Sequence, residues 1–213
     1  MLADRDDHLL PTAPALQPLL PDGGLRRGTA IGVTGIGATS LSLALLAEAT
    51  ASGAWCAAVG LNALGPLAAE HAGVTLSRLI LVADPGDDWP TIVAALLDAF
   101  EIVLLRPPTR VGGSLQRRLT ARIRERQRVL VVTTDETVGL PVDLTLTGVT
   151  GTWEGLGWGA GHLHSRQLQI RADGRRLGGR PRHASVWLPD LQGRIAPGMP
   201  VTTPVPLRPG RVA

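Results

Sequence analysis

One short stretch of the chain has the residue types and spacing of a phosphate-binding loop. Residues 32–40 read GVTGIGATS, and the motif G-x-x-x-x-G-K-[ST] is met at Gly32, Gly37 and Thr39. In such a loop, backbone amides converge on a phosphate at the start of a helix, and a lysine places its charge near the β- and γ-phosphates. Here Ala38 stands in the lysine position. The stretch therefore has the pattern of a degenerate phosphate-binding loop.

Two interpretations of this loop are open. Its candidate anion-binding residues are Gly32, Gly35, Gly37, Thr39 and Ser40. A helix N-terminus favours negative charge, so these residues suit weak phosphate binding even without the lysine. Alternatively, the glycines only make a tight turn between a strand and a helix, which is the interpretation we favour. We expect no cofactor.

Other residue types that bind metals or react are sparse. Histidines occur at His71, His162, His164 and His183, and the "HLH" run places two of them on one face of a strand. Because no carboxylate lies nearby at a ligand spacing, we expect no metal site. The single cysteine, Cys56, lies in the apolar run AWCAAVGL and is expected to be a buried hydrophobic residue.

The composition fits one domain with a small appendage and limits the function classes. The chain has 213 residues, 44% of them hydrophobic, and a formal net charge of +3. All of its basic side chains apart from histidine are arginines. This charge permits contact with nucleic acid but does not predict it. With no signal-peptide pattern at the N-terminus and no apolar stretch of ~20 residues, we expect a cytoplasmic protein without contact to a membrane.

The pattern of apolar residues predicts an α/β fold. Short apolar runs alternate with helical segments up to about residue 134, which is typical of a mainly parallel sheet with helices on both faces. We expect strands at 29–33, 54–61, 78–84, 101–107 and 128–134, and helices at 38–53, 65–73, 88–100 and 112–127. Three further strands without helices between them, at 142–155, 163–176 and 183–190, are expected to extend one edge as antiparallel or mixed strands, with ADGR at 172–175 as a tight hairpin turn. The predicted organisation is an arm at 1–20, a domain at 21–190 and a proline-rich tail at 191–213.

The order of motifs from residue 23 to 134, and more weakly to 176, resembles the core of the RecA family of recombinases. The matching pieces after the loop are Ala63-Leu64 with Pro66, Ala72-Gly73-Val74 and Leu79-Ile80. The resemblance implies a RecA-like core with a degenerate P-loop. It places Ala38 at the P-loop lysine, Leu61 at the water-activating glutamate and Arg106 at the acidic residue that helps to bind magnesium. These three replacements imply that the chain does not hydrolyse ATP and is not an enzyme.

Within that family the chain is most similar to the ImuA-type accessory proteins of bacterial mutasomes, in their shortened actinobacterial form. The segments TRVGG and ETVGLPV are too short for the DNA-binding loops of a recombinase. The resemblance implies a non-catalytic role in the SOS response, in DNA repair by translesion synthesis and in induced mutagenesis. The implied partner is an inactive Y-family polymerase homologue of the ImuB type, and indirectly an error-prone C-family polymerase. The alternatives are a SulA-like cell-division inhibitor and an ATP-dependent RecA paralogue in DNA repair.

Two regions are candidates for contact with macromolecules. A glycine-rich segment expected to be a mobile loop carries Trp153 and Trp158, and the proline-rich tail carries apolar and basic residues; the tail candidates for partner binding are Val201, Val205, Leu207 and Arg208. The helix at 112–127 is rich in arginine, and weak contact with DNA is possible at Arg117, Arg118, Arg122 and Arg124. The other interpretation of that helix is an ordinary solvated face.

Overall fold

The computed structural model describes residues 8–108, 111–134, 139–156 and 161–199. Trp158 and the tail candidates Val201, Val205, Leu207 and Arg208 lie outside the described residues. In the described part, nine strands form one sheet. From edge to edge their order is β11 (Ala196–Pro197), β10 (Arg182–Trp187), β9 (Gly161–Gly174), β8 (Leu144–Leu156), β3 (Thr29–Gly35), β7 (Val129–Thr133), β6 (Ile102–Leu105), β4 (Cys56–Val59) and β5 (Leu79–Val82).

Six of the strands in this sheet run parallel, as the alternating pattern predicts. β3 pairs in parallel with β7 and β8, and the parallel pairing continues through β6 and β4 to β5. All residues of β4, β6 and β7 are buried. Strands covered on both faces need apolar side chains at every position, which explains why they read as continuous apolar runs in the sequence. The expected mixed α/β fold with a mainly parallel sheet is confirmed.

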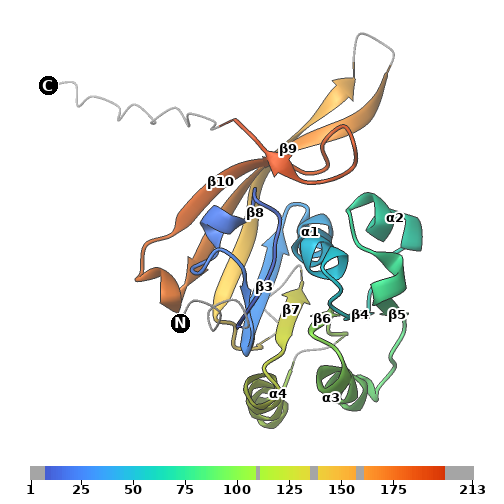
Figure 1. Cartoon of the computed structure of the whole chain (residues 1–213), viewed down its shortest axis with the longest axis vertical. Helices are drawn as coiled ribbons and strands as arrows, with labels where there is room; N and C mark the ends of the chain where they lie inside the picture. Colours follow the sequence, from blue (N-terminus) through green and yellow to red (C-terminus); the bar gives the residue numbers. More distant parts are fainter. Residues whose placement is uncertain (1–7, 109–110, 135–138, 157–160, 200–213) are drawn as a thin grey trace, which may run out of the picture.

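Helices cover both faces of this sheet (Figure 1). One face carries α1 (Ala38–Ala51) and α2 (Pro66–His71), whose apolar side chains pack with Ile31, Ala58 and Leu104. The other face carries α3 (Trp89–Ala99) and α4 (Gly113–Glu125). These two helices pack with Val59, Leu105 and other strand residues that alternate along the chain with the residues facing α1 and α2. Because successive side chains of a strand point to opposite faces, the two clusters lie on opposite sides of the sheet.

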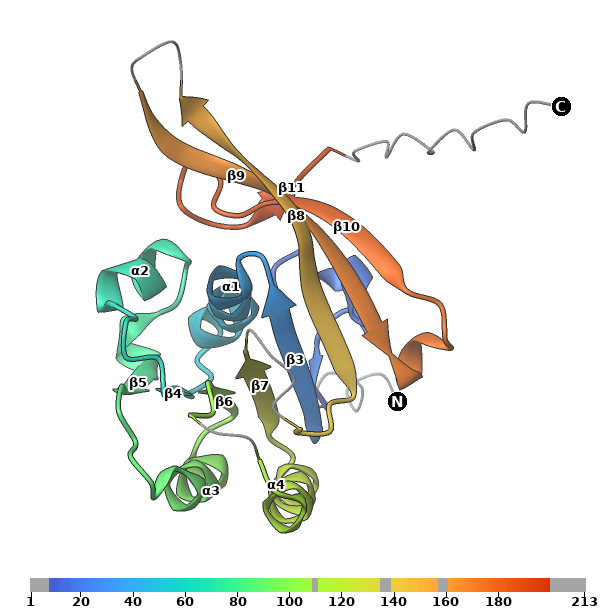
Figure 2. The same ribbon diagram turned by 180° about the vertical axis from the view of Figure 1, so that it is seen from behind.

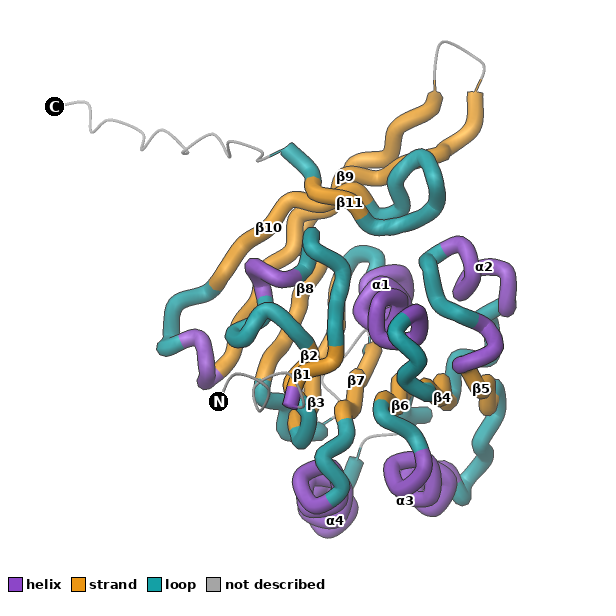
Figure 3. Tube along the Cα trace, in the orientation of Figure 1, coloured by secondary structure: helices purple, strands orange, loops and turns teal. Residues whose placement is uncertain are grey.

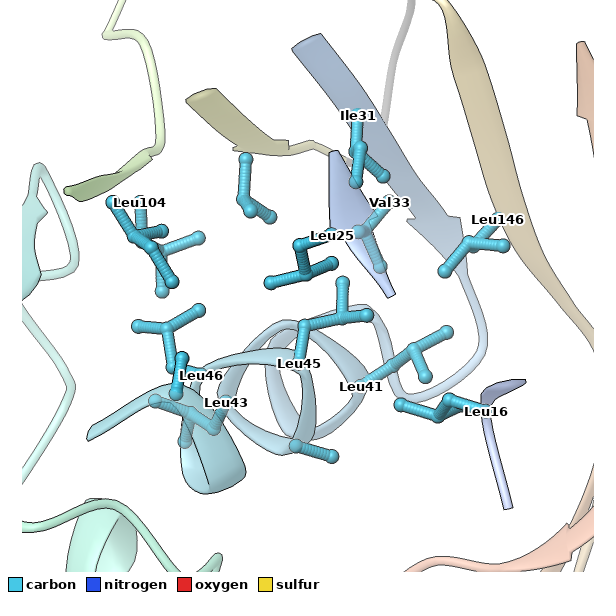
Figure 4. Packing of buried hydrophobic residues seen from close by; sticks show 14 of the residues in the cluster. Leu16, Leu25, Ile31, Val33, Leu41, Leu43, Leu45, Leu46, Leu104 and Leu146 are labelled. Carbon is cyan, nitrogen blue, oxygen red and sulfur yellow. The ribbon is translucent and has the colours of Figure 1, made fainter. Parts of the chain in front are cut away.

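The α1 helix is buried on most of its surface. Leu41, Leu45 and Leu46 are fully buried, and Figure 4 shows them facing the sheet residues Val33 and Leu104. This explains why its sequence is apolar almost throughout rather than along one stripe. A helix buried in this way is a fixed support for the turn that precedes it.

Residues 9–26 pack against the same core. β1 (Leu9–Leu10) pairs with β2 (Leu25–Arg26) in a separate two-stranded sheet, and η2 (Gln17–Leu19) lies between them in the chain. Leu16, Leu19 and Leu20 are almost completely buried. The residues expected to form an arm therefore contribute apolar side chains to the domain. Their leucines are separated by prolines, so the sequence has no periodicity that would have indicated this packing.

β9 and β10 extend the sheet beyond β8 in antiparallel fashion, as expected, whereas β8 itself runs parallel to β3. β11, in the predicted tail, adds a further antiparallel strand. β8 and β9 form a long hairpin that projects beyond the helices (Figure 2). The prediction of a mobile loop at Trp153 is wrong, because this residue lies in β8 and pairs with Arg166 in β9. The prediction of a tight turn at 172–175 is also wrong. Gly174 still pairs with Leu144, and the chain reverses later, through η4 (Arg175–Leu177) and two glycines with positive φ.

The chain after β10 remains part of the folded domain up to residue 199. The loop from Leu188 passes between the β8–β9 hairpin and α1 and α2 (Figure 3). Ile195 packs against the core, and β11 then pairs with Val186 and Trp187. Residues 191–199, expected as the start of a tail, are therefore held by side-chain and backbone contacts. No helix in the described residues is long and apolar enough to span a membrane.

Candidate functional site at the carboxyl edge of the parallel strands

The glycine turn lies between the end of β3 and the start of α1. Gly35 and Gly37 have φ of 77° and 73°, which favours glycine at both positions. The backbone NH of Ile36 donates a hydrogen bond of 2.9 Å to the carbonyl of Gly148 in β8. A side chain on Gly148 would collide with the Ile36 carbonyl, and one on Gly35 would collide with Gly148. Packing against β8 is therefore sufficient to explain glycine at these positions.

The first turn of α1 has no side-chain cap. Gly37 is its N-cap residue, and the first turn contains no acidic residue. Thr39 and Ser40 are half-buried there, and Ala38 is buried. Such a helix start carries a positive partial charge, and its free NH groups point away from the helix toward any acceptor in front of it. This end of α1 is thus suited to a negatively charged group.

Arg166 of β9, which is not among the residues predicted from the sequence, also lies at this turn. Its side chain is 7% exposed, and its Nε donates a hydrogen bond of 2.9 Å to the carbonyl of Leu188. The guanidinium lies over the ring of Trp153, 5.0 Å from the centroid, and its Nη2 lies against Gly37. In the described part of the chain, Nη2 has no hydrogen-bond acceptor. Burial lowers the pKa of Arg166 below its ordinary value.

A signal for this arginine exists in the sequence. β9 contains the run RQLQI, and its period of two places Arg166 on the same face as Leu168 and Ile170. Both of these residues are buried in the core beside α1. An arginine in line with core positions is unusual, because a buried charge is normally paired. The alternation in this strand therefore marks Arg166 as a buried arginine.

A cavity of about 500 Å³ lies in front of α1. Thr39, Ser40 and Leu43 line it from α1, and Leu61 to Leu64 line it from the loop after β4. The other walls come from α2, from Arg106 after β6, from His164 in β9 and from the loop after β10. Ligand sites in open α/β sheets commonly lie in this place, outside the carboxyl ends of parallel strands.

The structure brings two of the predicted loop residues and two of the replaced positions to this cavity, whereas Gly32 and Gly35 lie in β3 and Gly37 lies before α1. Leu61 and Arg106, which are far apart in the sequence, line it together with Thr39 and Ser40. Ala38 is buried between Gly37 and Thr39 at the start of α1. The three positions identified by the resemblance therefore lie at one edge of the sheet.

The cavity wall combines apolar side chains with groups that favour an anion. Its described lining contains leucines, alanines and a proline, but no aspartate or glutamate. Its polar groups are the hydroxyls of Thr39 and Ser40, the amide of Asn62 and the side chains of Arg106 and two histidines. This set is able to hold a negatively charged group with an apolar body. It offers no carboxylate to act as a general base or a magnesium ligand.

The histidines and the cysteine do not form a second site in the described structure. His162 and His164 are neighbours in β9, with ring centroids 6.1 Å apart, and only His71 and His164 line the cavity. Among the described residues, no group of three potential metal ligands lies together. Cys56 is fully buried, as expected, and burial is the main cause that raises its pKa to about 12.

The arginine-rich helix lies away from this cavity, on the opposite face of the sheet. Arg122 and Arg126 of its last turns both contact Asp98 of α3, and the hydrogen bond from Arg122 is the main cause that lowers the pKa of Asp98. Arg117, Arg118 and Arg124 are exposed and, within the described residues, make no ion pair. Of the four arginines predicted to contact DNA, Arg122 is therefore paired with Asp98. The other three make no ion pair among the described residues.

The fold and the site define a class of protein: an α/β domain with a mainly parallel sheet, in which a glycine turn, a buried arginine and an apolar cavity meet at one edge. The family model described as "MT3502 N-terminal domain" matches residues 18–139. The chain belongs to this family. It is also 33% identical over 177 residues to the "Uncharacterized protein Rv3395c" of Mycobacterium tuberculosis (strain ATCC 25618 / H37Rv), an alignment that covers 80% of this chain and 82% of that protein.

Proposed function

We propose that this chain is a non-catalytic accessory protein in DNA-damage-induced translesion synthesis. In this proposal its α/β domain is a RecA-like core with a degenerate P-loop, as in the ImuA-type proteins that the sequence resembles. Its partner is an inactive Y-family polymerase homologue of the ImuB type, through which it acts beside an error-prone C-family polymerase. The protein supports the assembly of these partners and carries out no reaction itself.

One observation carries the proposal. Ala38, Leu61 and Arg106 lie together at the edge of the sheet where a P-loop ATPase would bind and hydrolyse its nucleotide. Alanine provides no charge for the phosphates, leucine provides no base for the attacking water, and arginine repels magnesium. Each replacement removes a different contribution to phosphoryl transfer. A domain that keeps this edge without those groups is better suited to binding than to hydrolysis.

The proposed binding surface includes the projecting β8–β9 hairpin. Trp153 is 44% exposed there, and Leu156 and Leu163 are also exposed large apolar residues. Exposed aromatic residues near an arginine are common at the energetic centres of protein interfaces. The tail residues Val201, Val205, Leu207 and Arg208 remain part of the proposed surface on the basis of their sequence.

Co-purification from cells treated with a DNA-damaging agent tests the proposal. The tagged full chain should recover the polymerase-like partner, and the purified protein should show no ATPase activity above a buffer blank. Recovery of a tubulin-like division protein in place of the polymerase-like partner would instead favour the SulA-like alternative. ATP turnover that is stimulated by single-stranded DNA would favour the recombinase paralogue.

A further inference from the structure

The described groups that line the cavity in front of α1 are neutral or basic. Its described lining has Arg106 and two histidines but no acidic side chain, and the uncapped start of α1 adds positive partial charge. A protein of this size could place any of its acidic residues at such an opening. Among the described lining residues, none carries a negative charge.

Arg166 adds a second and independent observation. It is more than nine-tenths buried, no carboxylate of the described residues lies within ion-pair distance of it, and its Nη2 has no acceptor. A buried guanidinium without a counter-ion is costly unless something else supplies the negative charge. The Nη2 atom lies against Gly37, where α1 begins, so the guanidinium and the helix start place positive charge side by side.

Arg166 lies directly behind residues that line the cavity. Its Nε is hydrogen bonded to Leu188, and His164 is two residues before it on the same face of β9; both of these residues line the cavity. Nη2 itself is shielded from water. Pairing with a ligand in the cavity therefore requires the Arg166 side chain to turn toward the opening.

The chemistry of the wall favours a single carboxylate over a polyphosphate. A triphosphate carries three or four charges and normally binds with a lysine and a magnesium ion. Here alanine replaces the lysine, and the lining supplies no carboxylate for a metal. Most of the wall is apolar, with Leu43, Leu61 and Leu64 on adjacent surfaces. A ligand with one carboxylate next to an apolar side chain matches both the groups that favour an anion and the apolar part of the wall.

We propose that this cavity binds an acidic and partly apolar peptide segment of a partner protein. One carboxylate of the segment pairs with Arg166 and the first turn of α1, and a neighbouring apolar side chain packs against Leu43, Leu61 and Leu64. The identity of the partner rests on the proposed function, but the binding chemistry does not. The site would thus have exchanged the nucleotide of an ATPase for a segment of protein.

Short synthetic peptides test the chemistry without any partner. The probe is acetyl-Leu-Asp-Leu-amide, and its neutral match is acetyl-Leu-Asn-Leu-amide. The full chain is titrated with each, and binding is followed by amide resonances and by the fluorescence of Trp153, which stacks on Arg166. We expect the aspartate peptide to bind about tenfold more tightly than the asparagine peptide, because a charge-assisted hydrogen bond is stronger than a neutral one.

Two variants locate the bound peptide. Arg166→Met keeps an apolar stem beside Trp153 but removes the charge, and it should abolish the preference for aspartate. Asn62→Asp adds one negative charge to the exposed rim with no change of shape and should weaken binding of the aspartate peptide severalfold, whereas Asn62→Ser should not. Arg124→Met, on the opposite face, is the control for loss of one arginine. The Asn62 pair keeps the test valid if Arg166→Met fails to fold.

The possible results separate the site from the proposed function. Equal binding of the two peptides, binding of neither, or tighter binding of magnesium-ATP at the same residues would overturn the proposal. In a pull-down with the polymerase-like protein, Arg166→Met should lose the partner while Arg124→Met retains it. If the wild-type chain binds the aspartate peptide but not this protein, the site stands and the proposed function fails.

Discussion

Trp153 and Arg166 face each other across the β8–β9 hairpin, with the guanidinium 5.0 Å from the centroid of the indole ring. The tryptophan covers one face of the guanidinium, and Gly37 lies against its Nη2. The pair therefore joins the projecting hairpin to the first turn of α1.

Replacement of Trp153 should weaken this connection. Trp153→Ala removes the cation–π contact and exposes Arg166 to water, so the free energy of unfolding should fall by about 1 kcal/mol, while Trp153→Phe should lose less. Urea denaturation measures both values. An alanine variant as stable as the wild type would show that the stacking contributes nothing to folding.

The glycine at position 148 should be required for the turn to approach β8. Gly148→Ala places a methyl group against the Ile36 carbonyl, so we expect a loss of about 1–3 kcal/mol in the free energy of unfolding. Gly65→Ala is the control, because its added methyl group meets no atom within 4 Å and its φ is negative. Thermal and urea melts compare the two, and equal stability would contradict the close packing of this turn.

Asp98 should make stability depend on pH in the acid range. Its pKa is lowered in the folded protein, chiefly by the hydrogen bond from Arg122, relative to the ordinary value of 3.8. The stability that ionised Asp98 adds to the fold is therefore complete above pH 3.8, and it is lost as the pH falls through the lower pKa of the folded state. Asp98→Asn should flatten this part of the urea-midpoint profile. Asp87→Asn, at an exposed position, should leave the profile unchanged; identical profiles for all three proteins would rule out the effect.

The exposed arginines of α4 should account for any binding of single-stranded DNA. Replacing Arg117, Arg118 and Arg124 by glutamine should weaken a low, salt-sensitive affinity and reduce the salt slope by about 0.7 for each phosphate that is no longer neutralised. Arg122→Gln should have a smaller effect, since Asp98 already pairs with that side chain. Fluorescence anisotropy with labelled single-stranded DNA at several salt concentrations measures the affinity and salt slope of each variant. An affinity that none of these changes alters would place DNA elsewhere.

The β11 strand and Ile195 give a prediction for truncation. Removal of residues 200–213 should leave the melting temperature nearly unchanged and weaken binding of the polymerase-like partner, if the tail is part of the binding surface. Removal from residue 191 onward should also lower the melting temperature, because it deletes β11 and the core contact of Ile195. Full partner binding by the shorter truncation would exclude the tail and leave the hairpin and the cavity in front of α1 as the binding surface.

The sequence was most informative where local pattern and tertiary position agree. The parallel strands are apolar at every position because both faces are covered, so Cys56–Val59 and Val129–Thr133 were recognisable as buried strands. The glycine turn was recognisable because a turn between a strand and a helix needs positive φ at Gly35 and Gly37. These features are local, and they were sufficient for the α/β core and for one edge of the candidate site.

The remaining features depend on contacts between distant residues. Arg166 is placed beside Gly37 by the pairing of β9 with β8, and the spacing of these two residues in the chain gives no hint of it. The same holds for Leu16, which is buried although its segment has no periodicity. The proposed acidic-segment site follows from such a long-range contact and was therefore beyond what the sequence pattern could indicate.

A calorimetric titration of the full chain with the purified polymerase-like partner, with and without magnesium-ATP, tests the central claim most directly. A non-catalytic binding domain should bind the partner with one affinity in both conditions, and magnesium-ATP alone should produce no heat of binding or hydrolysis. Absence of partner binding, or binding that requires magnesium-ATP, would contradict the account.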